Sequence, residues 1–198
     1  MVYDWREVPG WFTEGEAAWL SEAARKVSPG QCIVEVGSYC GRSAVVLGLS
    51  APDKVPVYCI DKWEGIPEDS FEVGVATRNG WPAQEAMQTG HHGGMSAAEF
   101  EANLRGFGLL HTKVFPIVGD FGKVAERITF PPIGLLFLDA DHSEEETVRA
   151  FKCYQPKLAP GATVFFHDVQ AYPAVALAIR QLALTVEPRR NLALWQAP

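Results

Sequence analysis

Residues 32–43 read CIVEVGSYCGRS, an apolar run followed by a glycine-containing turn. The run Cys32–Val36 has the length and composition of a strand that is buried on both faces. Gly37 and Gly41 then permit a tight turn and a close approach of the backbone to a ligand. Since a helical pattern follows, free N–H groups are expected at the turn, where they can bind an anion. The stretch therefore predicts a strand–turn–helix unit of a parallel sheet with a ligand at the turn.

The rest of the chain repeats this alternation of strands and helices. Six more strand-like runs follow, the last two forming an expected antiparallel pair: 55–60, 113–118, 134–138, 163–166, 184–186 and 192–195. Helical patterns cover 14–27, 43–49, 96–104, 144–157 and 172–184, the first with a capping box at Thr13 and Glu16 and the fourth closed by Pro160-Gly161. This order predicts an α/β fold with a mostly parallel seven-stranded sheet and helices on both faces.

The length of 198 residues suits one domain over residues 1–198. Residues 62–94 differ in kind, because they combine tryptophan, proline and glycine with little periodicity. Loops of this length tend to be lids or binding loops, so a lid-like insert is expected here. Trp63 and Trp81 either pack this insert or stack on a substrate ring.

Composition excludes several classes of protein. Apolar residues make up 47% of the chain and charged residues 21%, and the net charge of −7 argues against a nucleic-acid partner. The four cysteines form no C-x-x-C pair and are expected to be small buried thiols in a reducing compartment. The first residues lack the apolar core of a signal peptide, and no run is long enough to cross a membrane. A cytoplasmic protein without a membrane partner is expected.

An acidic residue at the end of the second predicted strand indicates which class of ligand the turn binds. The spacing of Gly37 and Gly41 is G-x-x-x-G, not the G-x-G-x-x-G of dinucleotide binders, and taken alone it fits a plain structural turn equally well. Asp61, however, lies where doubly wound folds hydrogen-bond a ribose diol. The two features together favour a nucleoside ligand.

Three motifs resemble a known family. VEVGSYCGRSAV (residues 34–45) resembles the first motif of catechol O-methyltransferase and its relatives. DADHS (139–143) and FHDV (166–169) resemble the pattern of bacterial methyltransferases of small molecules, such as those that act on macrolide sugars. The resemblance implies a Rossmann-like class I methyltransferase that transfers the methyl group of S-adenosyl-L-methionine to a small-molecule acceptor.

The resemblance also implies the residues around the cofactor. Those near residue 37 would face its methionyl end, with Ser43 on the carboxylate, Asp61 on the ribose and Gly119 to Phe121 at the adenine. The full implied set is Glu35, Gly37, Ser38, Tyr39, Gly41, Ser43, Asp61, Lys62, Gly119, Asp120, Phe121 and Asp139.

A metal site and a base follow from the same resemblance. Asp139, His167 and Asp168 stand where metal-dependent relatives have their ligands, and His142 stands where the catechol enzyme has its catalytic lysine. Because imidazole is a poor ligand for Mg²⁺, this set would favour Mn²⁺, Fe²⁺ or Zn²⁺ over Mg²⁺, or would bind no metal. The expected catalytic residues are His142, Asp139 and His167, with an imidazole pKa of about 6.5 suiting proton removal. His142 can instead cap the next helix beside Ser143.

Two other functions stay open. A nicotinamide-dependent oxidoreductase shares the broad fold but is disfavoured by the missing third glycine. A non-catalytic cofactor-binding module is the other alternative, since a fold does not fix a reaction. The acceptor is open among a sugar hydroxyl, a phenol and an amine, and so is assembly into a homo-oligomer.

Overall fold

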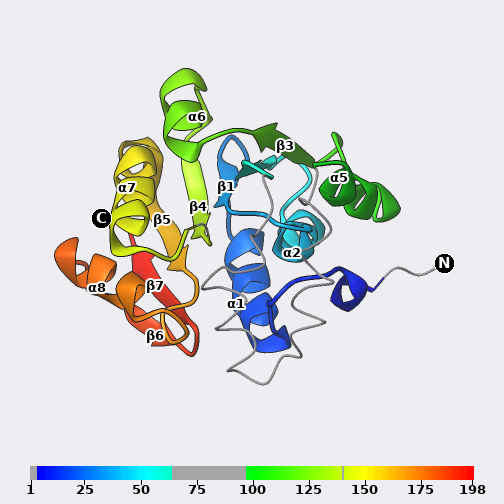
Figure 1. Cartoon of the computed structure of the whole chain (residues 1–198). Helices are drawn as coiled ribbons and strands as arrows, with labels where there is room; N and C mark the ends of the chain where they lie inside the picture. Colours follow the sequence, from blue (N-terminus) through cyan, green and yellow to red (C-terminus); the bar gives the residue numbers. More distant parts are fainter. Residues whose placement is uncertain (1–3, 64–96, 140) are drawn as a thin grey trace.

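The computed structural model describes residues 4–63, 97–139 and 141–198 (Figure 1). Its strands are β1 (Cys32–Val36), β2 (Val57–Asp61), β3 (Val114–Val118), β4 (Ile133–Leu138), β5 (Leu158–Phe166), β6 (Glu187–Arg189) and β7 (Leu192–Gln196). Its helices are α1 (Glu14–Arg25), α2 (Arg42–Ser50), α5 (Ala97–Gly106), α6 (Phe121–Arg127), α7 (Glu144–Tyr154) and α8 (Pro173–Gln181), with short 3₁₀ turns at Trp5–Glu7 and Gln155–Lys157.

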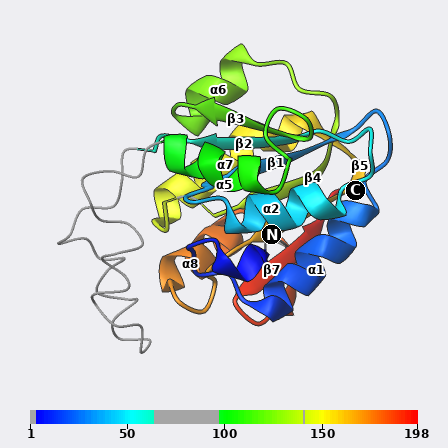
Figure 2. The same ribbon diagram turned by 90° about the vertical axis from the view of Figure 1, so that its right-hand side faces the viewer.

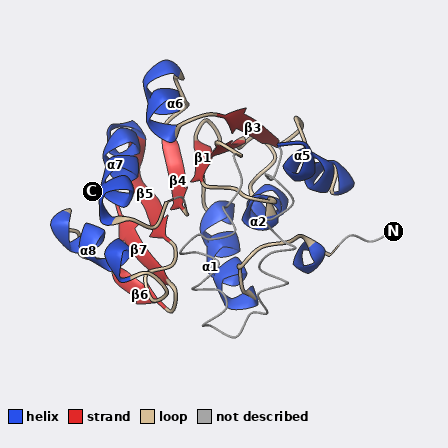
Figure 3. Cartoon of the chain, viewed as in Figure 1, coloured by secondary structure: helices blue, strands red, loops and turns tan. Residues whose placement is uncertain are grey.

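The strands form one seven-stranded sheet in the order β3-β2-β1-β4-β5-β7-β6. The first five strands along the chain pair in parallel, whereas β7 runs antiparallel to both β5 and β6. Figure 3 shows this sheet between two groups of helices. The predicted fold class is therefore confirmed, including the antiparallel pair at the end of the chain.

Two apolar clusters fill the two faces of the sheet. One joins β1 and β2 to α1, α2 and α5 through side chains such as Leu20, Leu47 and Phe100. The other joins β4 and β5 to α6, α7 and α8, with Phe151 and Ile179 among its members. In Figure 1 the sheet separates these two groups of helices, and in Figure 2 α1 and α2 face the viewer. Each large side chain that is fully buried contributes about 1.5–3 kcal/mol to folding.

Side-chain caps fix where two helices begin. Thr13 and Glu16 form the predicted capping box of α1. Ser143 accepts a hydrogen bond from the Glu146 N–H (3.2 Å) and caps α7. Ser143 therefore fills the capping role that His142 was also considered for, and the ring of His142 is left to face the carboxyl edge of the sheet.

The structure differs from the sequence-based prediction in three elements. Helix α6 was not predicted, because its seven residues include Gly122 and offer little periodicity. The strand predicted at 184–186 is wrong, since β6 lies at Glu187–Arg189 and holds Pro188 at the edge of the sheet, where a missing N–H is tolerated. Pro160-Gly161 does not terminate the helix, because α7 already ends at Tyr154 and these two residues lie inside β5.

Two further expectations concern the insert and membranes. Apart from Lys62 and Trp63, most of the insert at 62–94 lies outside the described residues, as does Trp81. None of the helices in residues 4–63, 97–139 and 141–198 is long and apolar enough to span a membrane. All four cysteines are free thiols, and Cys32, Cys40 and Cys59 are buried, as predicted. Cys153, which was also expected to be buried, is only half-buried.

Candidate active site

The candidate site lies at the carboxyl edge of the sheet, where the strand order reverses between β1 and β4. Ligands of doubly wound folds bind at such a switch point. Ladder hydrogen bonds continue past the strand ends here, from the Asp139 N–H to the Val36 carbonyl (2.8 Å) and from the His167 N–H to the Leu138 carbonyl (2.9 Å). The backbone thereby aligns Asp139 and His167 side by side along the edge.

The glycine turn between β1 and α2 depends on left-handed backbone angles. Gly37 has φ 87° and Gly41 has φ 92°, a region that disfavours side chains. A Cβ atom on Gly41 would also lie 3.0 Å from ring carbons of Phe100. Gly41 begins α2 without a side-chain cap, so the first N–H groups of the helix face the turn and are available to an anion.

Asp61, at the end of β2, holds this turn in place. Its Oδ2 accepts hydrogen bonds from the backbone N–H groups of Ser38 (2.8 Å) and Tyr39 (2.9 Å). Its Oδ1 accepts from the N–H of Trp63 (2.8 Å). A carboxylate has about four acceptor positions, so Asp61 has capacity for one more donor. Asp61 thus orders the turn and can still bind a hydroxyl group of a ligand.

Two side chains from α5 and the end of β2 fix the carbonyl groups of the same turn. The indole Nε1 of Trp63 donates to the Tyr39 carbonyl (2.8 Å), and Asn103 Nδ2 donates to the Cys40 carbonyl (2.9 Å). The Trp63 ring packs against Phe100, with 4.9 Å between ring centroids. Trp63 therefore supports the glycine turn, and it also lines the cavity.

Arg42 ties the N-terminal segment to the first turn of α2. Its guanidinium donates to the carbonyls of Val8 (2.5 Å), Phe12 (3.3 Å) and Arg6 (3.0 Å). Residues 9–12, which this contact holds, line the cavity beside the glycine turn. The ring of Trp11 lies 5.1 Å from that of Tyr39.

Glu35 holds the side chain of Ser43 at the start of α2. It is fully buried in β1, and Ser43 Oγ donates to its Oε1 (2.5 Å). Burial raises the pKa of Glu35 to about 7. Glu35 does not line the cavity, whereas Ser43, which donates to it, does.

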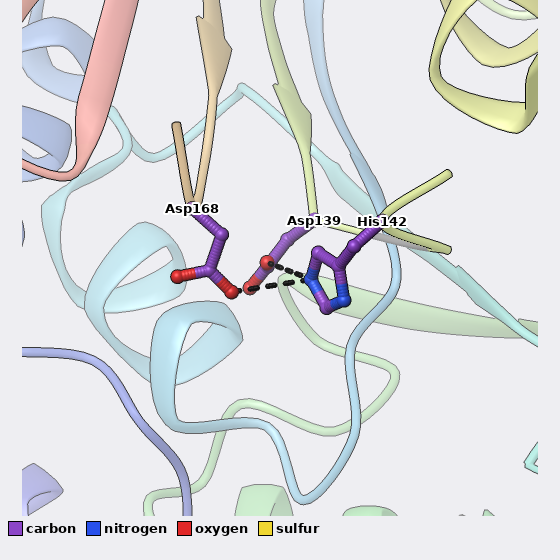
Figure 4. Close-up of side chains that lie close together, drawn as sticks. All are labelled: Asp139, His142 and Asp168. Carbon is purple, nitrogen blue, oxygen red and sulfur yellow. Dashed lines mark ion pairs between the residues drawn. The ribbon is translucent and has the colours of Figure 1, made fainter. Parts of the chain in front are cut away.

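Three ionisable side chains converge at the other end of the cavity (Figure 4). Candidate ligand atoms of Asp139, His142 and Asp168 all lie within 4.8 Å of one another. His142 Nε2 is 3.1 Å from Asp168 Oδ2 and 3.7 Å from Asp139 Oδ1. Burial would lower the pKa of His142, but its interactions with the two carboxylates outweigh burial and raise the pKa to about 9. The two carboxylates thus favour the protonated form of His142.

His167 occupies a different position from the one expected of a metal ligand. Its Nδ1 lies 2.8 Å from Asp139 Oδ1, and its Nε2 lies 3.2 Å from Glu16 Oε1. Burial alone would lower its pKa, but Asp139 and Glu16 raise the pKa well above the usual range. Because both ring nitrogens already face carboxylates, the cluster that can hold an ion contains His142 in place of His167.

Asn191, in the turn between β6 and β7, holds Asp168. Its Nδ2 donates to Asp168 Oδ1, and its Oδ1 accepts from the N–H groups of Gln170 (3.0 Å) and Ala171 (3.2 Å). These contacts stabilise a left-handed backbone at Asp168 (φ 60°). The other oxygen of Asp168 is thereby directed towards His142.

A cavity of about 370 Å³ joins the two ends of the site. Of the residues expected from the sequence, it is lined by Gly37, Ser38, Tyr39, Ser43, Asp61, Lys62, Gly119, Phe121, Asp139, His142, His167 and Asp168. Glu35, Gly41 and Asp120 do not line it. Asp120 caps α6 and pairs with Arg149 (2.8 Å), which lowers the pKa of Asp120. The Arg149 guanidinium also lies 4.0 Å from the centroid of the Phe121 ring, and so backs the cavity wall.

Sequence reasoning missed several residues of the site. From the sequence, Glu16 was predicted only as part of the capping box of α1. The capping box locates Glu16 at the start of the helix, but it gives no indication of the contact with His167. The contact of Asn191 could not be predicted from the sequence, because asparagine is a common turn residue and only the folded hairpin brings it to Asp168. Arg42 follows the glycine turn directly, and its binding of the N-terminal segment depends on tertiary structure.

The fold and the site together define a class: a Rossmann-like α/β domain whose cavity lies at the switch point of the sheet, with a glycine turn at one end and an acidic cluster at the other. Residues 34–169 match the family model described as a methyltransferase domain. Because this match covers more than half of the chain, the chain belongs to the methyltransferase domain family.

Solved structures with the same fold include several methyltransferases. The O-methyltransferase NovP has a TM-score of 0.68 and 20% identity, over 92% of this chain and 79% of its own. CalS11, a TDP-rhamnose 3′-O-methyltransferase of calicheamicin biosynthesis, has a TM-score of 0.58 and 15% identity, over 93% and 81%. The O-methyltransferase of Bacillus cereus in complex with SAH has a TM-score of 0.66 and 12% identity, over 98% and 86%. At these identities the likeness shows a shared fold.

Proposed function

We propose that this protein transfers the methyl group of S-adenosyl-L-methionine to an oxygen atom of a small-molecule acceptor, with the help of a divalent metal ion. The observation that carries the proposal is the shared cavity. It has the glycine turn and Asp61 at one end and the cluster of Asp139, His142 and Asp168 at the other. A cofactor held at the first end would face an acceptor at the second.

The residues at the first end fit S-adenosyl-L-methionine. The uncapped N-terminus of α2 suits the methionyl carboxylate, and Asp61 has an acceptor position for a ribose hydroxyl. Gly119 and Phe121 would border the adenine, where the aromatic ring offers a flat apolar surface. When bound, this cofactor supplies an electrophilic methyl group on a sulfonium sulfur.

The residues at the second end fit a divalent ion. Asp139 and Asp168 supply carboxylate oxygens and His142 a ring nitrogen, a set that suits Mn²⁺ better than Mg²⁺. Such an ion would supply positive charge that favours ionisation of an acceptor hydroxyl. Asp139, which the resemblance also places beside the cofactor, would then serve both the cofactor and the metal ion.

The chain's own residues orient the reactants and move a proton. Residues 9–12 and the glycine turn form part of the cavity wall, and would orient a bound cofactor and acceptor. His142 takes part in one of two ways: as a metal ligand, or as the base that accepts the acceptor's proton. As a base it must first lose the proton that the two carboxylates stabilise on it, so ion binding beside it favours the neutral ring.

An oxygen acceptor is supported by what the similar structures are named for. NovP is an O-methyltransferase, and CalS11 methylates a sugar hydroxyl. We infer a sugar hydroxyl or a phenol as the acceptor group. An amine is the second candidate, because the carboxylates of the acidic cluster attract its cationic form. That form must give up a proton to a group of the site before the nitrogen can accept the methyl group.

The test is methyl transfer itself. The protein is incubated with S-adenosyl-L-methionine carrying a ¹³C-methyl group, Mn²⁺, and a panel of a catechol, a deoxysugar and a primary amine. We expect a labelled O-methyl product from the catechol or the sugar. A product labelled only on nitrogen would contradict the oxygen acceptor, and cofactor binding without turnover of any acceptor would favour the non-catalytic module.

A further inference from the structure

Glu16 uses its two carboxylate oxygens for two different purposes. Oε2 accepts hydrogen bonds from the Thr13 N–H (2.7 Å) and the Thr13 hydroxyl (2.5 Å), which completes the capping box of α1. Oε1 lies 3.2 Å from Nε2 of His167, a residue 151 positions further along the chain. The cap needs only the first oxygen, so the second contact is not explained by the start of a helix.

The side chain is also deeply buried for a charged group. Glu16 is 2% exposed and His167 is 3% exposed. Burying charged groups is costly unless they are paired and hydrogen-bonded. An exposed glutamate at the same helical position would cap α1 equally well and avoid this cost. The buried arrangement therefore points to a role at the place that His167 contacts.

His167 connects Glu16 to the acidic cluster, because its two ring nitrogens contact different carboxylates. Its other nitrogen, Nδ1, lies 2.8 Å from Asp139 Oδ1. The ring packs against Phe12 and Phe137, with centroid distances of 5.9 and 5.8 Å, so apolar neighbours restrict its rotation. Glu16, His167 and Asp139 thus form a continuous line from the first turn of α1 to the end of β4.

We infer that Glu16 is a positioning residue of the candidate active site. By holding Nε2 of His167, Glu16 fixes the ring in the orientation in which Nδ1 binds Asp139 Oδ1. That contact fixes the direction of the Asp139 carboxylate towards His142 and Asp168. The inference rests on the proposed function, because Asp139 is a candidate metal ligand there. Outer partners of this kind commonly alter metal affinity by about 10–100-fold when they are removed.

The test compares Glu16→Gln with the matched control Thr13→Ala. Glutamine retains the length of the side chain and an acceptor for the cap, but it removes the carboxylate from His167. Thr13→Ala removes the hydroxyl from the same cap but retains the Glu16 carboxylate and the Thr13 N–H that donates to its Oε2, and its crystal structure checks that the contact between Glu16 and His167 remains. Each variant is examined by titration calorimetry with Mn²⁺, by titration calorimetry with S-adenosylhomocysteine, and by crystallography of the metal-free protein.

We expect Glu16→Gln to weaken Mn²⁺ binding by about 10–100-fold and to rotate the Asp139 carboxylate in the crystal, with affinity for S-adenosylhomocysteine changed less than about twofold. Thr13→Ala should leave all three unchanged. Because Glu16 acts only through His167, the double variant Glu16→Gln/His167→Asn should bind Mn²⁺ no more weakly than His167→Asn alone.

Equal effects of Glu16→Gln and Thr13→Ala would overturn the inference and reduce Glu16 to a helix cap. Additive losses in the double variant would also overturn it. If the wild-type protein binds no Mn²⁺, the proposed metal site fails, and the crystal structures then decide the inference separately. An Asp139 carboxylate that stays in place in Glu16→Gln would contradict it.

Discussion

The imidazole of His142 stacks on the ring of Tyr172, with 4.0 Å between centroids and 16° between planes. Tyr172 lies directly before α8, so the C-terminal half of the chain fixes the plane of a ring that belongs to the loop after β4. In this plane Nε2 of His142 faces the carboxylates of Asp139 and Asp168. The stacking pair is therefore part of what assembles the acidic cluster.

Removing this ring should disorder His142. We expect Tyr172→Ala to lower kcat and Mn²⁺ affinity by about 10–100-fold, the range seen when supporting partners of a metal site are lost. Tyr172→Phe keeps the stacked ring and should retain both within about threefold. Steady-state kinetics and calorimetry on the two variants check this. Equal losses in the two variants would assign the effect to the hydroxyl and contradict the role of stacking.

Chelation should separate methyl transfer from cofactor binding. Because Asp139, His142 and Asp168 form the candidate ion site, EDTA should abolish transfer and leave binding of S-adenosylhomocysteine nearly intact. Mn²⁺ should restore activity at least as well as Mg²⁺, since His142 supplies a nitrogen ligand. Assays after dialysis against EDTA and addition of each ion provide the measurement.

The same assay tests His142. If His142 is the general base, the substitution His142→Ala should lower kcat by about 10²–10⁴-fold. Activity that survives both EDTA and His142→Ala would rule out a catalytic role for the cluster. The site would then consist of the cofactor cavity alone.

Glu35 should make stability depend on pH. Its pKa is about 7 in the folded protein against 4.5 for the unperturbed group, so the folded state binds the proton more tightly. The free energy of unfolding should then fall as the pH rises from about 4.5 to about 7, by up to about 3 kcal/mol from this group, and level off above. Glu35→Gln cannot ionise and should lack this contribution.

Urea unfolding of wild type and Glu35→Gln between pH 5 and pH 8 measures the difference. The variant should gain stability relative to wild type as the pH rises. Glu126→Gln, which removes one charge from the exposed side of α6, serves as the control. Parallel curves for wild type and Glu35→Gln would show that Glu35 ionises in the folded state as freely as in the unfolded chain.

The sequence was sufficient to locate the parallel strands along the chain, because buried runs such as Cys32–Val36 are short, apolar and bounded by turns. It also placed Asp61, Asp139 and Asp168 at strand ends, where topology alone brings them to one edge. Two elements with weak sequence patterns, α6 and β6, were not predicted correctly. Helix α6 is a single short helix begun by the Asp120 cap, and β6 contains a proline that only an edge strand tolerates.

Side-chain partners over long separations could not be predicted. His167 was expected to be a metal ligand because the resemblance places it where metal-dependent relatives have one. Nothing local in the sequence shows that Glu16 and Asp139 lie against both of its ring nitrogens. The same holds for Asn191, whose contact with Asp168 depends on the C-terminal hairpin. Such contacts follow from packing between distant segments, which periodicity and spacing do not encode.

The central claim is that the cavity binds S-adenosyl-L-methionine at the glycine turn, and titration calorimetry with S-adenosylhomocysteine tests it most directly. We predict saturable binding to the wild-type protein, no binding of NAD, and loss of most of the affinity for S-adenosylhomocysteine in Asp61→Ala, because the ribose contact and the support of the turn are both removed. Asp53→Ala, a surface change near Lys113, should bind like wild type. Binding of NAD without binding of S-adenosylhomocysteine would contradict the account.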